Sequence, residues 1–234
     1  MCIAIFALRE LGKFALPSEW ETRHLPKPHM NVAFAAMEEK DIFRRRWTSW
    51  ANRLKLKDRL PTMSVLGDGA HWIWDGSKLA FGKTKENLDI YHALENLSEC
   101  GKVLYKAGSS EFVAWQEKTK RLLLEEGYEG VHAFLGEQKQ MHRKEGEAET
   151  AEWKALERVD GYLTWHKERL NDRERLSEGR AIGSGQIEGA CKSMIGARLK
   201  QTGARWKKSR VNKMGVVCSL FYADQWDEYW KYAK

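Results

Sequence analysis

The positions of the prolines constrain this chain more than any other feature of its sequence. All four lie in the first 61 residues, at Pro17, Pro26, Pro28 and Pro61. Because proline lacks a backbone donor and disrupts helix interiors, we expect strands and loops in the N-terminal quarter, with Cys2 to Leu8 as a short buried strand. The remaining residues can form long helices, and from about 93 to 175 their apolar spacing is helical.

Two apolar runs predict a strand–helix–strand unit. Met63 to Gly67 has the pattern of a strand that ends at Asp68, and Asn87 to Tyr91 has the pattern of a second strand. The residues between them are numerous enough for a crossover helix, which favours parallel strands. Because functional groups in open α/β sheets gather at the carboxyl ends of strands, Asp68 is a candidate site residue.

A second candidate carboxylate lies near the start of a late helix. Gly183 to Gly185 precedes an apolar-periodic stretch, and the Ser184 hydroxyl can accept a hydrogen bond from a free amide at the helix N-terminus. Glu188 lies one turn inside this helix. A single glutamate in this position is usually solvated, so the surrounding sequence has to decide its role.

The stretch after Glu188 is strongly basic. No acidic residue occurs between Glu188 and Asp224, in a chain whose formal net charge is +7. Uncompensated positive charge beside an aromatic side chain is typical of contacts to nucleic-acid phosphates, although a solvated basic helix has the same composition. The candidate DNA-binding residues are Lys192, Arg198, Lys200, Arg205, Trp206, Lys207, Lys208 and Arg210, and Lys213 is a further base in the stretch.

A carboxylate beside a phosphate-binding surface is repelled by the phosphates unless a cation neutralises the repulsion. Mg²⁺ (or Mn²⁺) prefers hard oxygen ligands, and two such ions ~4 Å apart stabilise the attacking and leaving oxygens of a phosphoryl displacement. This chemistry needs several carboxylates together. Asp68 and Glu188 are the candidate metal ligands.

The cysteines and the hydropathy argue for a cytoplasmic protein. Cys2, Cys100, Cys191 and Cys218 include no closely spaced metal-ligand pair, and the sequence shows neither a signal peptide nor a long apolar segment. We therefore expect reduced thiols and no membrane partner.

Three blocks of the sequence resemble a known family. Leu66-Gly-Asp-Gly-Ala-His-Trp-Ile-Trp74, Leu88-Asp-Ile-Tyr-His-Ala-Leu-Glu-Asn-Leu97 and Ile182-Gly-Ser-Gly-Gln-Ile-Glu-Gly-Ala-Cys-Lys192, followed by Gly203-Ala-Arg-Trp206, are similar to successive signature blocks of Kra-type insertion-sequence transposases. These are bacterial DDE-type enzymes related to the mutator-like group. The blocks occur in the same order, and the similarity extends over essentially the whole chain.

The resemblance implies an α/β fold with a ribonuclease-H-like core, a large all-helical insertion and a helical C-terminus. Residues 1–92 would form the N-terminal part of the catalytic core, 93–180 the helical insertion, and 181–234 the catalytic helix with the basic DNA-contacting region. Asp68 matches the second metal-binding carboxylate of the family and Glu188 the third. Asp89 and His92 match a D-x-x-H block on the next strand, which we expect to support the site.

The sequence departs from the family pattern at its start. The first carboxylate of the family lies on a strand upstream of the one that Cys2 to Leu8 matches, so we expect a C-terminal portion of a transposase whose core lacks its first, central strand. A competing interpretation makes Asp68, Asp89 and Glu188 the complete triad.

These observations leave three hypotheses. The first is a transposase that cuts and joins DNA at insertion-sequence ends and in target DNA, acting as a homo-oligomer on DNA. The second is a noncatalytic DNA-binding remnant that keeps the basic and aromatic contacts. The third is an unrelated helical interaction protein, for which DNA binding would be absent or insensitive to salt.

Overall fold

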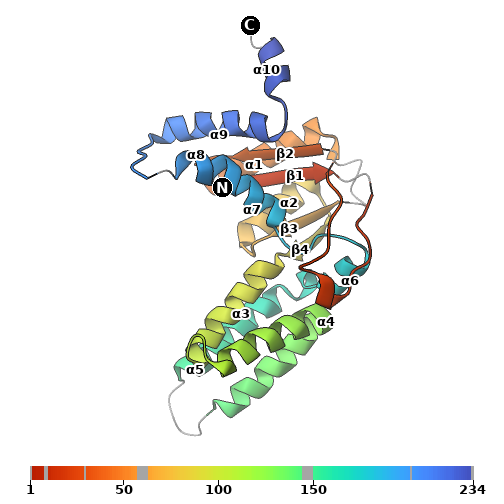
Figure 1. Ribbon diagram of the computed structural model, residues 1–234, viewed down its shortest axis with the longest axis vertical. Coiled ribbons are helices and arrows are strands. Elements are labelled where there is room, and N and C mark those ends of the chain that lie inside the picture. The colour runs from red at the N-terminus through yellow and green to blue at the C-terminus, as the bar shows by residue number, and fades with distance from the viewer. Residues whose placement is uncertain are drawn as a thin grey trace.

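A computed structural model of the chain describes residues 2–7, 10–28, 30–56, 63–143, 150–200 and 202–232 (Figure 1). Leu8, at the end of the first predicted strand, and Pro61 lie outside these residues. The described part combines a small layer of strands, helices on both faces of that layer, and a long helical bundle below it.

Four strands form two separate pairs. β1 (Cys2–Ala7) is antiparallel to β2 (Met30–Ala35), and the short helix η1 (Pro17–Glu19) lies in the connection between them. β3 (Ser64–Gly67) is parallel to β4 (Lys85–Leu88), and α2 (His71–Phe81) is the crossover helix. The predicted parallel strand–helix–strand unit is therefore confirmed.

The predicted second strand, Asn87 to Tyr91, was placed two residues too late at its start and three too late at its end. It ends at Leu88, and α3 (Ile90–Leu104) begins where Asn87 to Tyr91 was expected to remain extended. The cause is the side chain of Asp89, which accepts a hydrogen bond from the backbone N–H of Tyr91 and so starts a helix. His92 consequently lies in the first turn of α3 and not on a strand.

The strands lie in one layer, in the order β2, β1, β3, β4 (Figure 1). Within the described residues, β1 is hydrogen-bonded only to β2, and β3 only to β4. Each inner strand therefore keeps one edge outside any ladder of the described chain. An edge of this kind is open to pairing with a further strand.

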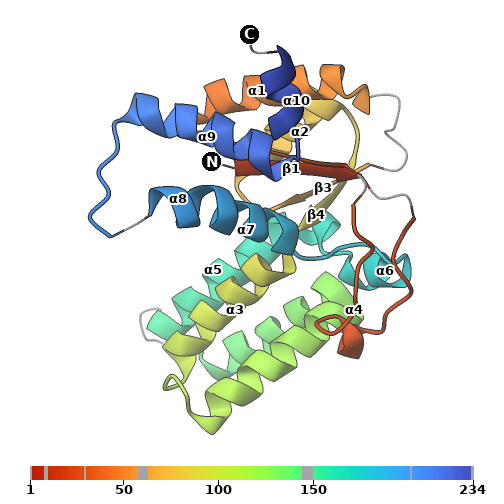
Figure 2. The same ribbon diagram turned by 45° about the horizontal axis from the view of Figure 1, so that its top comes forward.

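Helices cover both faces of the layer (Figure 2). On one face, α1 (Lys40–Arg53) packs against α2, and Phe34 of β2 joins Phe43 and Trp47 of α1 in one apolar cluster. On the other face lie α7 (Gly185–Cys191), which contacts β1, and α9 (Lys208–Tyr222), which contacts β2. Alternate residues of β2 serve the two faces, as the period of a strand requires.

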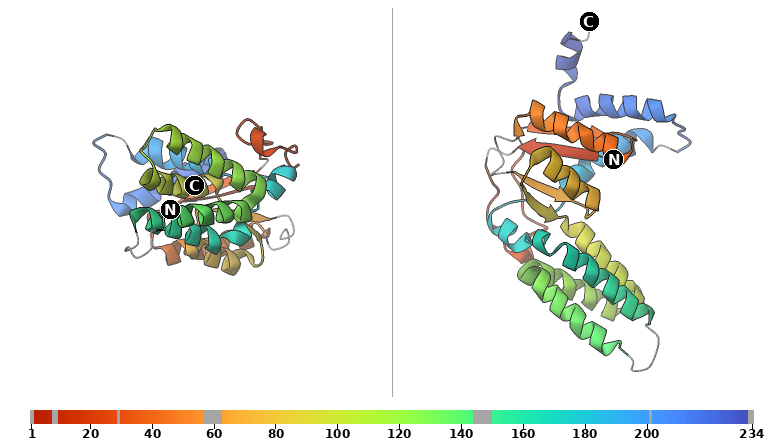
Figure 3. Two further views of the ribbon diagram at one scale, coloured as in Figure 1. Left: turned by 90° about the horizontal axis from the view of Figure 1, so that it is seen from below. Right: turned by 180° about the vertical axis from the view of Figure 1, so that it is seen from behind.

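A helical bundle extends away from the strands (Figure 3). α3, α4 (Ser110–Met141) and α5 (Ala151–Trp165) pack against one another around Leu97, Trp115, Leu123, Leu135 and Leu156. α4 consists of two helices that meet at a kink at Gly127, whose φ of 67° is not helical. η3 (Lys167–Arg169) and α6 (Asp172–Ser177) lead the chain back toward the strands. The helical character expected for this region is confirmed.

The C-terminal region is also helical. α7 continues as the π-helix η4 (Lys192–Gly196) and α8 (Ala197–Leu199), and α10 (Trp226–Tyr232) follows α9 and projects from the molecule (Figure 1). No helix among the described residues has the length and apolar character needed to cross a bilayer.

Candidate active site

Asp68 stands at the carboxyl end of β3, as the sequence predicted. Its Oδ1 accepts a hydrogen bond from the backbone N–H of Ala70 at 3.0 Å, and the residue is exposed. Gly69 follows with φ of 96°, a conformation that side chains other than glycine rarely adopt. A Cβ atom there would lie 2.6 Å from Tyr162 Oη and 3.0 Å from His166 Nε2. The turn that presents Asp68 thus requires glycine for two reasons.

Asp89 lies at the end of the neighbouring strand and is 1% exposed. Its backbone N–H donates to Gly67 O at 2.8 Å, which continues the pairing of β4 with β3 by one residue. Oδ1 accepts the N–H of Tyr91 at 3.1 Å. Oδ2 is buried and has no hydrogen-bond partner among the described residues. Asp68 and Asp89 therefore follow two adjacent parallel strands at the same carboxyl-terminal edge of the sheet.

The segment before Glu188 is fastened directly to Asp89. The N–H of Ser184 donates to Asp89 Oδ1 at 3.3 Å, and the N–H of Ile90 donates to Ile182 O at 3.1 Å. These bonds place the first turn of α7, with the exposed Glu188, beside the N-terminus of α3. Ser184 is the N-cap residue, but its hydroxyl makes no capping bond in the described structure, which corrects the role predicted for it.

The charges of the three carboxylates affect the pKa values of two nearby tyrosines. Burial, together with the negative charges of Asp68 and Asp89, raises the pKa of Tyr162 to about 12. Burial also raises the pKa of Tyr91, with Glu188 and Asp89 among the charges that add to the effect. Asp89 is therefore among the charges that act on both hydroxyls, together with Asp68 at Tyr162 and Glu188 at Tyr91.

His166 shares the helical spacing of the apolar residues Leu156, Val159, Leu163 and Leu170, and it lies directly behind the Asp68 turn. It is fully buried, with its ring centroid 4.8 Å from that of Tyr162 and 5.9 Å from that of Trp74. Burial, together with the charge of Arg169, lowers the pKa of His166 to about 4. The imidazole is therefore neutral at physiological pH. A polar residue on an otherwise apolar helical stripe was the available signal.

A second buried polar group, Asp172, lies near Asp89 and contacts Asn87 of β4. Asp172 is 1% exposed, and its Oδ1 accepts a hydrogen bond from Asn87 Nδ2 at 3.3 Å. Burial raises the pKa of Asp172 to about 7, against the lowering effects of the Asn87 bond and the Arg175 charge. Arg175 Nη2 donates to Ala181 O at 2.7 Å and so holds the chain that leads into α7. Neither Asp172 nor Arg175 was singled out from the sequence.

His92 lies apart from these contacts. Its side chain is 42% exposed, and Nδ1 is 3.4 Å from Glu95 Oε2, one turn further along α3. The structure therefore places His92 at the rim of the site, with a solvated partner.

The predicted DNA-binding residues lie along α7 to α9 on the outer side of the strand layer (Figure 2). None of them forms an ion pair with another described residue. Trp206 is 39% exposed. The exposed members are Lys192, Arg198, Lys200, Arg205, Lys207, Lys208 and Arg210.

The donor atoms of the site suit a hard cation. Asp68 and Glu188 offer exposed carboxylates, and the buried Oδ2 of Asp89 has a lone pair that no described donor satisfies. Oxygen ligands of this kind are those that Mg²⁺ and Mn²⁺ prefer. Among the described residues, no group of three His, Cys, Asp or Glu side chains is already gathered closely enough to hold a metal ion.

Comparison with known proteins gives one match. The model of a family described as Uncharacterised protein family (UPF0236) matches residues 19–226. No curated protein and no solved structure matches the chain. The matched range includes Asp68, Asp89 and Glu188 and the whole basic stretch.

Proposed function

The chain belongs to the uncharacterised protein family UPF0236, and we propose that it is the catalytic core of a DDE-type transposase, which cuts and joins DNA strands with the help of Mg²⁺ or Mn²⁺. One observation carries the proposal. Asp68 and Asp89 end adjacent parallel strands, and the Asp89 carboxylate accepts a hydrogen bond from the backbone N–H of Ser184, the N-cap residue of the helix that carries Glu188. The basic residues without ion-pair partners follow in η4, in α8, in the connection after α8 and at the start of α9.

Asp68 and Glu188 would hold the metal, with the buried Asp89 oxygen as a further ligand or as a support for the other two. When bound, the metal supplies charge neutralisation at the scissile phosphate and activates the attacking water or 3′-hydroxyl. The protein holds the candidate metal ligands in position. Gly69 and the rings of Tyr162 and His166 fix the turn of Asp68, and the Ser184 amide fixes α7.

The basic stretch would hold the DNA. Phosphate contacts position a nucleic acid without reading its sequence, and lysine and arginine that lack acidic partners are available for them. Lys192 lies directly after the helix that carries Glu188. The phosphate backbone of DNA bound along this stretch would therefore pass close to the candidate metal ligands.

The ribonuclease-H-like core is part of the same proposal. Such a core needs a central strand, and the edges of β1 and β3 that no described strand pairs are where that strand would lie. A carboxylate at the end of such a strand would stand next to Asp68. The competing triad of Asp68, Asp89 and Glu188 requires no further strand.

Strand cleavage of supercoiled DNA in the presence of Mg²⁺ or Mn²⁺ tests the proposal. We expect Asp68→Asn to abolish metal-dependent nicking, because it removes a charged ligand. Asp75→Asn, which changes an exposed aspartate on the adjacent helix α2, is the matched control and should nick as the unaltered chain does. Equal nicking by Asp68→Asn and Asp75→Asn would contradict the assignment.

The noncatalytic DNA-binding remnant is the second candidate, favoured by the absence of a ready-made group of three metal ligands in the described residues. It predicts DNA binding that weakens steeply with salt and no metal-dependent nicking. Nicking by the 234-residue chain would exclude it. Absent or salt-insensitive DNA binding would instead favour a helical interaction protein.

A further inference from the structure

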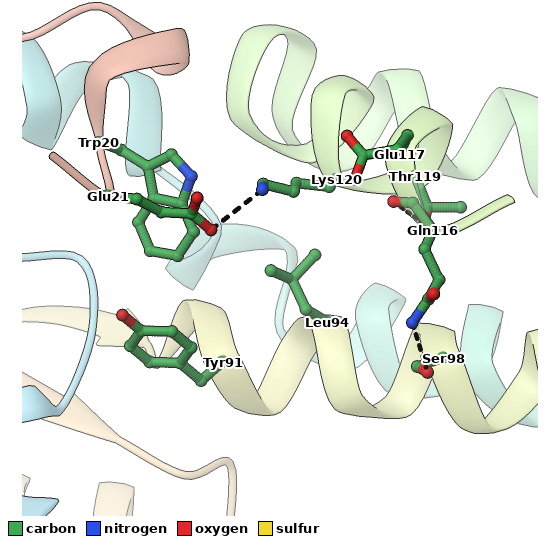
Figure 4. A pocket seen from close by; sticks show the side chains of 9 residues that line it. All are labelled: Trp20, Glu21, Tyr91, Leu94, Ser98, Gln116, Glu117, Thr119 and Lys120. Carbon is green, nitrogen blue, oxygen red and sulfur yellow. Dashed lines mark hydrogen bonds and ion pairs between the residues drawn. The ribbon is translucent and has the colours of Figure 1, made fainter. Parts of the chain in front are cut away.

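A pocket opens where the η1 connection, α3 and α4 meet (Figure 4). It encloses about 250 Å³. This volume is slightly smaller than the roughly 300–1,000 Å³ of pockets that enclose a drug-sized ligand. The pocket therefore suits a single small ring system.

Two aromatic side chains form one wall of the pocket. The ring centroids of Trp20 and Tyr91 are 5.4 Å apart, with their planes tilted by 48°. Tyr91 is 47% exposed, so part of its ring is free to stack on a ligand. Trp20 is 7% exposed, and its Nε1–H is buried without a hydrogen-bond acceptor in the described structure. In Figure 4 this nitrogen lies on the side of the indole that faces Lys120.

The opposite wall is polar. Gln116 Nε2 donates to Ser98 Oγ at 3.1 Å, and this bond joins α4 to α3 (Figure 4). An amide held in this way presents a carbonyl oxygen in a fixed direction. A ring with a hydrogen-bond donor on its edge can be bound by this oxygen.

The charge of the lining argues against a phosphate. Lys120 Nζ is 3.0 Å from Glu21 Oε1, so its charge is already compensated. Glu117 also lines the pocket, which leaves a net charge of −1 from two carboxylates and one ammonium group. An anionic group would be repelled, whereas a neutral heterocycle would not.

Tyr91 connects the pocket to the candidate active site. Its backbone N–H donates to Asp89 Oδ1, and its ring packs so closely on Gly183 that a Cβ there would lie 2.6 Å from Tyr91 Cε2. A ligand stacked on Tyr91 is therefore next to the segment that carries Glu188.

We infer that this pocket takes an unpaired nucleobase from the DNA strand whose backbone passes Asp89 and Glu188. The inference rests on the proposed function. Enzymes that act on a duplex often extrude a base and hold it by stacking and by hydrogen bonds to its edge. The exposed part of the Tyr91 ring, backed by Trp20, would supply the stacking, and the Gln116 carbonyl oxygen an edge contact.

Binding of a fluorescent base analogue tests this inference without relying on cleavage. Two duplexes are compared in EDTA, one with 2-aminopurine as a single unpaired nucleotide and one with 2-aminopurine fully paired. We expect the unaltered chain to bind the unpaired probe about tenfold more tightly and to quench its emission by stacking. Tyr91→Leu and Gln116→Leu should each reduce this preference, Tyr91→Leu by about tenfold.

Two variants serve as matched controls. Tyr232→Leu removes a tyrosine that is 81% exposed and lies far along the chain, and Arg121→Gln changes a side chain on α4 outside the pocket. Both should keep the preference. Equal binding of the two probes, or a preference that survives both Tyr91→Leu and Gln116→Leu, overturns the pocket assignment. Failure of the pocket assignment does not affect the nicking test of the proposed function. Conversely, preferred binding of the unpaired probe without Asp68-dependent nicking would refute the proposed function and not the pocket.

Discussion

Asp89 Oδ1 accepts the backbone N–H of Ser184, a residue that follows it by 95 positions, at 3.3 Å. The same oxygen accepts the N–H of Tyr91 and so starts α3. One buried carboxylate therefore fixes the beginning of the helical bundle and the beginning of α7. Because Glu188 lies on α7, the position of this candidate ligand depends on Asp89.

Replacement of Asp89 tests this anchoring role. Asp89→Ala removes the N-cap acceptor of α3 and leaves the Ser184 amide without its partner, so we expect the free energy of unfolding to fall by about 1–3 kcal/mol. Asp89→Asn retains one acceptor oxygen and should cost less. Urea unfolding measures both. Equal losses for the two variants would show that the hydrogen bonds from Tyr91 and Ser184 do not anchor the helices.

The contact between Gly183 and Tyr91 predicts a difference between neighbouring glycines. A Cβ at Gly183 would lie 2.6 Å from Tyr91 Cε2, whereas one at Gly185 would meet nothing within 4 Å. We expect Gly183→Ala to lower the free energy of unfolding by about 1–3 kcal/mol through overpacking. Gly185→Ala, in a helix, should be neutral or stabilising by up to about 1 kcal/mol. Thermal unfolding of the pair would refute the packing if Gly183→Ala were the more stable.

The buried side chains of Asp172 and His166 predict opposite dependences of stability on pH. The folded-state pKa of Asp172, about 7, is raised above its unfolded value, so its contribution is present at low pH and is lost between about pH 4 and pH 7. The folded-state pKa of His166, about 4, is depressed below its unfolded value of roughly 6.5. Its contribution is therefore present above about pH 6.5 and is lost on acidification toward pH 4.

Single variants separate these effects. Between about pH 4 and pH 6.5 the two slopes oppose each other, each by at most about 1.4 kcal/mol per pH unit. Relative to the unaltered chain, Asp172→Asn should make the slope of the free energy of unfolding against pH more positive. His166→Phe should make the same slope more negative. Urea unfolding across this range gives the slopes. The same slope for both variants would disprove the assignment of opposite shifts.

The basic stretch predicts a specific salt dependence of DNA binding. We expect the combined change of Lys207, Lys208 and Arg210 to glutamine to reduce the slope of log K against log salt by about 2–3, because each lost phosphate contact removes roughly 0.9. A matched triple change to glutamine at Lys102, Lys118 and Arg121, on the helical bundle, should leave the slope unaltered. Fluorescence anisotropy at several salt concentrations provides the measurement, and equal slopes for the two triple variants would exclude this DNA surface.

The sequence predicted the elements well where one local pattern dominates. The apolar run at Val65 and Leu66 indicated β3, and the two residues after that strand already marked Asp68 as a strand-end carboxylate. Asp89 shows where local reasoning fails. A short apolar run beside an aspartate is compatible with a continuing strand, and only the amides of Tyr91 and Ser184 show that Asp89 caps a helix.

The supporting residues of the site could not be predicted in this way. His166 and Tyr162 are placed against Gly69 by the packing of α5, which lies about a hundred positions away in the chain. The burial of Asp172 likewise depends on its contact with Asn87, 85 positions earlier in the chain, which no spacing rule contains. Long-range packing decides which polar residues face a site and which face solvent.

Metal-dependent DNA nicking by Glu188→Gln is the most direct test of the proposed transposase core. Glu188 is exposed, so the substitution should leave the free energy of unfolding within about 0.5 kcal/mol of the original. We expect it to abolish nicking in Mg²⁺ or Mn²⁺, while Glu129→Gln, an exposed glutamate on α4, nicks normally. Undiminished nicking by Glu188→Gln would contradict the central claim that Asp68 and Glu188 hold a catalytic metal.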